Sequence, residues 1–183
     1  MNPPTSRLSG RGLSAALAAG VLALPLCAQA LVIMGEKDIP RVVSFGGPCP
    51  GCDLSGRQLY GARFVGADFS GAAFVGANLR QVQFTGTDFS RSDLSRSDLS
   101  DARISGVDFD GARMTDVRLD GARVRGASFT GADFEGASLR GVVFFGVDLS
   151  GARNLRQDQL DGACATGAVR LPRGLFLRPC PRD

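Results

Sequence analysis

The 183-residue sequence contains no histidine and no tryptophan, and it has one tyrosine and one lysine. The absence of histidine excludes Ser-His-Asp and Cys-His nucleophiles and histidine-ligated metals. No sequence motif of a Gly-rich phosphate loop or of a calcium-binding GGxGxD repeat is present. With 21 basic and 18 acidic residues, the formal net charge of +3 does not by itself predict nucleic-acid binding. We therefore expect no enzyme activity, no cofactor and no metal site.

The first thirty residues have the composition of a secretory signal. Arg7 and Arg11 precede an apolar stretch at residues 13–26, and Ala28-Gln29-Ala30 places small residues at the −3 and −1 positions of a cleavage site. We expect cleavage after Ala30 and a periplasmic or secreted protein that is not stably inserted in a membrane afterwards.

Two other readings of this segment stay open. Residues 13–34 are long enough to serve as an uncleaved membrane anchor, although Pro25 and Gln29 interrupt the apolar run. Lipid attachment to Cys27 is the other possibility, but Leu26 stands where lipidation requires a small residue.

A five-residue period fills most of the remaining sequence. From Leu54 to Leu149 every fifth residue is apolar, over twenty consecutive positions. At 44% hydrophobic content, chance gives such a run with a probability of about 10⁻⁷. Neither the helical period of 3.6 nor the strand period of 2 produces this pattern. We call these twenty residues the centres: Leu54, Leu59, Phe64, Phe69, Phe74, Leu79, Phe84, Phe89, Leu94, Leu99, Ile104, Phe109, Met114, Leu119, Val124, Phe129, Phe134, Leu139, Phe144 and Leu149.

The positions around each centre are also restricted. Two residues before it the side chain is small, except at Arg57, and two residues after it glycine occurs in fifteen of the twenty repeats. The repeat Ala67-Asp68-Phe69-Ser70-Gly71 is typical. Over residues 52–153 this pattern resembles the pentapeptide-repeat family. The resemblance implies an all-β fold, a right-handed quadrilateral parallel β-helix with four pentapeptides per coil. The five residues that replace glycine are Gln81, Arg91, Arg96, Asp101 and Asp116.

The residue spacing agrees with four repeats per coil. At a stride of twenty residues, one set of centres is all leucine and another contains four phenylalanines, as expected if each set stacks on one wall of the helix. Twenty repeats give about five coils and a rod roughly 24 Å tall. We expect an N-terminal cap at residues 31–51, the β-helix at 52–153 and a C-terminal cap at 154–183, following the signal at 1–30.

Four cysteines remain after residue 30, and exported proteins commonly pair such cysteines. A disulfide requires Cα atoms within about 7 Å, so no bridge can join the two ends of the rod. We expect the pairs Cys49–Cys52 and Cys164–Cys180. A redox-active CxxC motif at residues 49–52 is the alternative, although the motif opens no βαβ unit.

Outward positions carry charge in stripes. Before the centres of one wall stand Asp68, Asp88, Asp108, Ser128 and Asp148, and before those of the adjacent wall stand Arg63, Gln83, Arg103, Arg123 and Val143. We expect the two stripes to neutralise each other, with a charged groove for a ligand or partner as the alternative.

Val143 and Phe145 flank the centre Phe144 and should face outward. We expect the C-terminal tail to cover both side chains, with Leu171, Leu175, Phe176 and Leu177 laid over the last coil. The alternative is a dimer or partner contact at Val143 and Phe145.

These observations favour a non-catalytic exported scaffold for protein interaction or envelope structure, with an unknown protein partner or self-association and no nucleic acid. Some pentapeptide-repeat proteins mimic duplex DNA and bind gyrase, and a DNA-mimicking gyrase-binding protein of the quinolone-resistance type is the alternative. Residues 52–153 hold 13 acids and 12 arginines, whereas a DNA mimic needs strong charge of one sign.

Overall fold

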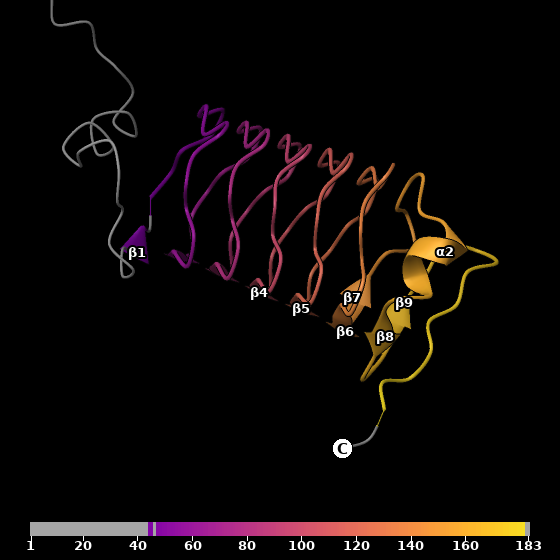
Figure 1. Ribbon diagram of the computed structural model, residues 1–183. Coiled ribbons are helices and arrows are strands. Elements are labelled where there is room, and N and C mark those ends of the chain that lie inside the picture. Colours follow the sequence, from indigo (N-terminus) through magenta and orange to yellow (C-terminus); the bar gives the residue numbers. More distant parts are fainter. Residues whose placement is uncertain (1–43, 46, 182–183) are drawn as a thin grey trace, which may run out of the picture.

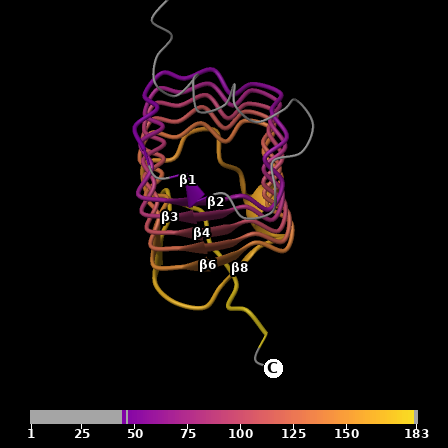
Figure 2. The same cartoon turned by 90° about the vertical axis from the view of Figure 1, so that its left-hand side faces the viewer.

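The computed structural model describes residues 44–45 and 47–181. The predicted signal at 1–30 and most of the predicted N-terminal cap lie outside the described residues. The described chain winds as a parallel β-solenoid (Figure 1), and its coils superpose in a four-sided outline when seen along the axis in Figure 2. The predicted four-sided parallel β-helix is confirmed. Within the described residues, no helix has the length and apolar character needed to cross a membrane.

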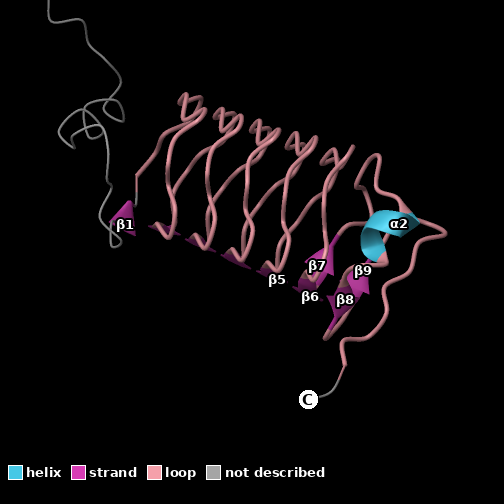
Figure 3. Ribbon diagram, viewed as in Figure 1, coloured by secondary structure: helices cyan, strands magenta, loops and turns pink. Residues whose placement is uncertain are grey.

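One side of the solenoid is a seven-stranded parallel sheet, and short elements close the C-terminal end (Figure 3). The sheet consists of β1 (Ser44–Phe45), β2 (Arg63–Val65), β3 (Gln83–Thr85), β4 (Arg103–Ser105), β5 (Arg123–Arg125), β6 (Val143–Phe145) and β8 (Cys164–Ala165). The other elements are β7 (Val147–Asp148), which pairs with β9 (Val169–Arg170), and the helix α2 (Gln157–Leu160).

Stacked coils pair residues twenty positions apart. In the sheet Phe64 pairs with Phe84, and Phe84 with Ile104. On the other three walls single bridges have the same stride, as between Asp68 and Asp88. The predicted four repeats per coil are therefore confirmed on every wall.

Three of the four corners of each coil are hydrogen-bonded turns. In one of them the Ala72 N–H donates to the Phe69 carbonyl at 3.0 Å, and Gly71 has a φ of +64°, as a type II turn requires at its third position. The five residues that replace glycine have the same left-handed backbone, with φ between 56° and 60°. The coil thus imposes this conformation even on residues with side chains, at a steric cost of about 1–2 kcal/mol each.

The interior is filled by the centres and the small residues before them. All twenty centres are buried. On one wall the rings of Phe89, Phe109 and Phe129 stack with centroid separations of 5.3 and 4.9 Å. Arg57, the exception in the small-residue series, is exposed. Inward packing therefore follows the sequence period closely.

The coil begins earlier than the sequence pattern predicts. Cys49 is buried and lies five residues before Leu54, and its N–H donates to the Asp68 carbonyl at 2.7 Å. It therefore occupies the position of one more centre. Its disulfide partner Cys52 fills the small-residue position and is partly buried.

Both expected cysteine pairs form disulfides, with Cα–Cα distances of 5.4 Å for Cys49–Cys52 and 4.9 Å for Cys164–Cys180. The first bridge lies within one turn of the first described coil. The second ties β8 to the last residues of the tail, where the Cys180 N–H donates to the Ala165 carbonyl at 3.0 Å. Each end of the rod thus has one covalent link.

The C-terminal segment continues the stack and covers its end. β8 pairs with β6 and β9 with β7, at strides of 21 and 22 residues because extra residues are inserted after residue 153. Leu160 is buried in the core, and Leu171, Leu175 and Leu177 pack against it. The segment is therefore both a partial coil and a cap.

The prediction that Phe176 covers the last coil is wrong, because its side chain is 65% exposed. Leu175 and Leu177 pack against the core, whereas the side chain of the residue between them points outward. The Gln157 side chain fixes this orientation: its Oε1 accepts the Phe176 N–H at 3.1 Å, and its Nε2 donates to the Phe176 carbonyl at 3.2 Å.

Replacing Phe109 by alanine tests the core assignment. The ring is fully buried between two stacked neighbours, so the Phe109→Ala change should lower the free energy of unfolding by about 3–5 kcal/mol. The control is Ser105→Ala, on an exposed position of the same coil, which should cost less than about 0.5 kcal/mol. Equal losses in chemical denaturation of the two variants would contradict the inward and outward assignment.

A chain truncated after Gly162 tests the cap. The truncation removes β8 and β9 and exposes the edges of β6 and β7, including the Leu149 N–H that donates to the Arg170 carbonyl at 2.7 Å. Uncovered strand edges beside apolar residues promote association. Light scattering should show larger particles for the truncated chain and a single small species for the full-length chain. A truncated chain that remains monodisperse would show that the tail is not a cap.

Candidate functional site

The sheet wall of the rod presents a flat surface that carries positive charge only. We call the outward residues of β2 to β6 the arginine face. Strand alternation directs these side chains away from the core. The face contains four arginines and no acidic residue: its members are Arg63, Val65, Gln83, Thr85, Arg103, Ser105, Arg123, Arg125, Val143 and Phe145.

Two of these arginines lie directly opposite each other. Arg103 and Arg123 are paired in register on adjacent strands, and like charges in such a pair are destabilising. Among the described residues no carboxylate forms an ion pair with either of them or with Arg63. On another wall, by contrast, Arg113 lies 3.7 Å from a carboxylate oxygen of Asp93. Arg63, Arg103 and Arg123 therefore have no ion-pair partner among the described residues.

The adjacent wall carries the acidic stripe, which we call the aspartate wall (Asp68, Asp88, Asp108 and Asp148). Each of these carboxylates accepts the backbone N–H two residues later, at 2.7–3.0 Å. Within the described residues no ion pair joins the aspartate wall to the arginine face. The predicted neutralisation of one stripe by the other therefore does not occur through ion pairs, because the acids bind their own turns.

Hydrogen bonds lower the pKa of two of these four carboxyl groups, Asp68 and Asp148. The pKa of Asp68 is lowered from its ordinary value of 3.8 by the backbone N–H and then the hydroxyl of Ser70. The pKa of Asp148 is lowered by the hydroxyl and backbone N–H of Ser150 and, to a smaller extent, by Arg170. A negative wall thus borders the positive face along the length of the rod.

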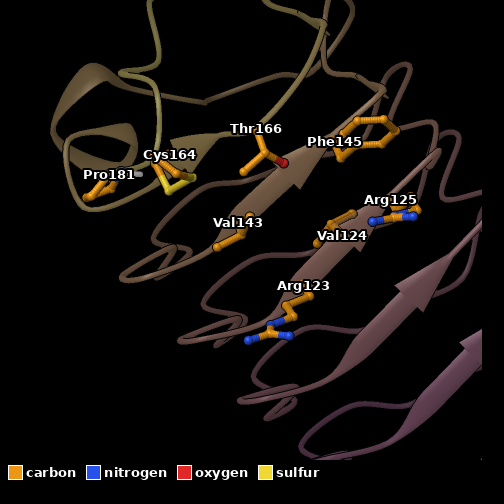
Figure 4. A pocket seen from close by; sticks show the side chains of 9 residues that line it. Arg123, Val124, Arg125, Val143, Phe145, Cys164, Thr166 and Pro181 are labelled. Atoms are coloured by element: carbon orange, nitrogen blue, oxygen red, sulfur yellow. A yellow bond between two sulfur atoms is a disulfide. The ribbon is translucent and has the colours of Figure 1, made fainter. Parts of the chain in front are cut away.

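The arginine face is hollowed near its C-terminal end. A depression of about 440 Å³ lies between strands β5 and β6 and the tail (Figure 4), and a second of about 510 Å³ adjoins it over β3 to β5. Arg123 and Arg125 border both depressions, which together we call the groove. The remaining lining residues of the first are Val124, Val143, Phe145, Cys164, Thr166, Cys180 and Pro181.

Phe145 forms the aromatic end of the groove. The tail covers it only in part, since its side chain is 43% exposed and Val143 is half-buried, so the expectation that the tail covers both residues is not met for Phe145. The Arg125 guanidinium carbon lies 4.9 Å from the centre of the ring. A Cβ on Gly167 would lie 2.7 Å from the ring atoms Cδ2 and Cε2, so a side chain at position 167 would displace the Phe145 ring.

The sequence pattern indicated most of this face but missed Arg125. The basic stripe was recognised only in the residues before each centre, whereas Arg125 directly follows Val124. The same five-residue period, applied to the position after each centre, would have found it. In the described part of the chain, no cluster of three or more His, Cys, Asp or Glu side chains could hold a metal ion.

The lowered pKa values of Asp68 and Asp148 predict a loss of stability in acid. A carboxylate whose pKa is lower in the folded chain stabilises the fold above its unfolded pKa, and this contribution disappears as the pH falls through the folded value. The melting temperature should therefore decrease as the pH is lowered below about 4. Asp148→Asn, which retains an acceptor oxygen but cannot ionise, should show a smaller fall. An identical pH dependence in the variant and the parent chain would contradict this role of Asp148.

Comparison with known proteins agrees with the repeat pattern. Two family models described as pentapeptide repeats match residues 77–116 and residues 50–93 and 109–153. No curated protein matches the chain in sequence.

Among solved structures, QnrB1, a plasmid-mediated fluoroquinolone resistance protein, is similar at 24% identity over 73% of this chain and 78% of its own, with a TM-score of 0.49. HetL, a pentapeptide-repeat protein involved in heterocyst differentiation regulation in the cyanobacterium Nostoc sp. strain PCC 7120, shares 22% identity over 71% of this chain and 72% of its own, with a TM-score of 0.33.

The two family models together span residues 50–153 without a gap, which is the same segment that forms the stacked coils. The chain therefore belongs to the pentapeptide-repeat family.

Proposed function

We propose that the chain is a non-catalytic, exported scaffold that contacts a protein partner through its arginine face in the periplasm or cell envelope. The observation that carries this proposal is the unneutralised pair Arg103 and Arg123 on a flat wall of a rigid rod. The fold gains nothing from such a pair, since like charges repel at this spacing. An external acidic group would compensate it.

Export is supported by two features. Residues 1–30 have the order of a secretory signal, and disulfides such as Cys49–Cys52 and Cys164–Cys180 persist mainly in oxidising compartments. The scaffold role is supported by the core, in which repeated burial of the centres makes a stiff support for side chains on its walls.

The charge distribution is unfavourable for the alternative of a DNA-mimicking gyrase-binding protein. A mimic of duplex DNA must present negative charge around its circumference. Here the aspartate wall lies beside a wall whose only charged outward side chains are arginines. We therefore rank the scaffold first.

Cell fractionation with N-terminal sequencing tests export. We expect a periplasmic or secreted protein that begins at Leu31, because Ala30 precedes the predicted cleavage site. A cytosolic protein that retains Met1 would contradict export.

Site-specific photocrosslinking in cells tests the contact surface. A photoreactive residue at position 105, exposed on the arginine face, should give a defined protein adduct. The control position is Glu135, which is exposed on the opposite wall and should give none. The same adducts from both positions, or none from either, would contradict a contact through the arginine face.

A further inference from the structure

We propose that the arginine face binds an extended acidic polypeptide segment with an apolar side chain at the end that lies beside Phe145. This inference rests on the proposed function of the face and specifies the chemistry of its partner. Arginine guanidinium groups present paired N–H donors that match the two oxygens of a carboxylate. The face offers four such groups and no competing carboxylate of its own.

The length of the face suits a short extended segment. Adjacent coils are about 4.8 Å apart, so that Arg63 and Phe145 are separated by four coils, or roughly 19 Å along the rod. An extended chain advances about 3.3 Å per residue, and about six residues cover this distance. Side chains on one side of such a segment recur about every 6.6 Å, which allows alternate carboxylates to reach the arginines.

The width of the face excludes a broad polyanion. The aspartate wall adjoins it, and its carboxylates are held in place by hydrogen bonds from the backbone of their own turns. A duplex nucleic acid would extend past the edge of the face and bring phosphates near Asp68, Asp88 and Asp108. A single polypeptide strand can remain on the positive wall.

The aromatic group on the face is unsuited to single-stranded nucleic acid. Such ligands are held mainly by stacking of bases on free aromatic rings. The Arg125 guanidinium already lies over the ring of Phe145, and the tail contacts the ring at Gly167. The ring, which is 43% exposed, can therefore contact an apolar side chain, whereas its contacts with Arg125 and Gly167 compete with stacking of a base.

The C-terminal end of the groove matches an apolar residue. Val143, Phe145, the Cys164–Cys180 disulfide and Pro181 border it, while Arg123 and Arg125 mark where the basic part of the groove begins (Figure 4). A segment with carboxylates followed by a leucine-sized side chain would complement both parts of the groove.

Fluorescence anisotropy with the purified, disulfide-bonded chain tests this inference. The probe is a fluorescein-labelled peptide of six glutamates with a leucine at each end, so that either chain direction places a leucine beside Phe145. We expect saturable binding that Arg103→Gln/Arg123→Gln weakens by about tenfold, as expected for the loss of charge-assisted hydrogen bonds. Replacing the terminal leucines by glycine should weaken binding by about threefold.

The matched control is Arg113→Gln/Arg118→Gln, which removes the same charge from the other walls, where these arginines pair with Asp93 and Asp120. Binding by this variant should stay within about twofold of the parent chain, since it leaves the arginine face intact. Circular dichroism verifies that both variants are folded. Equal weakening by the two pairs would overturn the proposal, because it would show that only net charge matters.

Binding of labelled DNA and sedimentation distinguish three other ligands that the arginine face could bind. Tighter binding of a labelled twelve-nucleotide thymidine strand or of duplex DNA would overturn the proposal in favour of nucleic acid. Sedimentation that shows self-association dependent on Arg103 and Arg123 would overturn it in favour of a second copy. If the peptide does not bind while crosslinking from position 105 still gives a specific adduct, the acidic segment is wrong and the scaffold function stands.

Discussion

The structure depends on the hydrogen-bonded stacking of one coil on the next at a stride of twenty residues. Each backbone N–H that bonds to the next coil requires its wall to keep the same register, as between Asp68 and Asp88 or Phe64 and Phe84. The register in turn fixes which side chains enter the narrow interior. A single repeat could bury nothing, and stability comes from the stack as a whole.

This constraint also arranges the charges. With the interior positions committed, two outward side chains flank each centre, and stacking places residues twenty positions apart side by side on each wall. Aspartates gain a local partner, because a carboxylate before a centre accepts the N–H of its own turn, as Asp68 does from Ser70. An arginine in a strand has no equivalent partner in its own coil. The aspartate wall therefore stabilises the turns, whereas the arginine face presents its charge to solvent.

Much of this could be predicted from the sequence, because a strict period leaves one way to stack the chain. The centres, the four walls and the cysteine pairs follow from it. Cys49 was missed as a centre because a cysteine breaks the Leu/Phe pattern. The orientation of Phe176 depends on the Gln157 side chain, and the approach of Gly167 to Phe145 depends on the path of the tail, where the period has ended. The spacing of residues in the sequence does not predict such contacts between irregular segments.

The central claim is that Arg103 and Arg123 are held together at a cost to the fold. Its most direct test is the free energy of unfolding of Arg123→Gln, measured by chemical denaturation at low and at high salt. We predict that this variant is more stable than the parent chain at low salt by about 0.2–1 kcal/mol, and that the gain disappears at about 1 M salt, where charges are screened. A variant that is less stable than the parent chain at low salt would contradict the account.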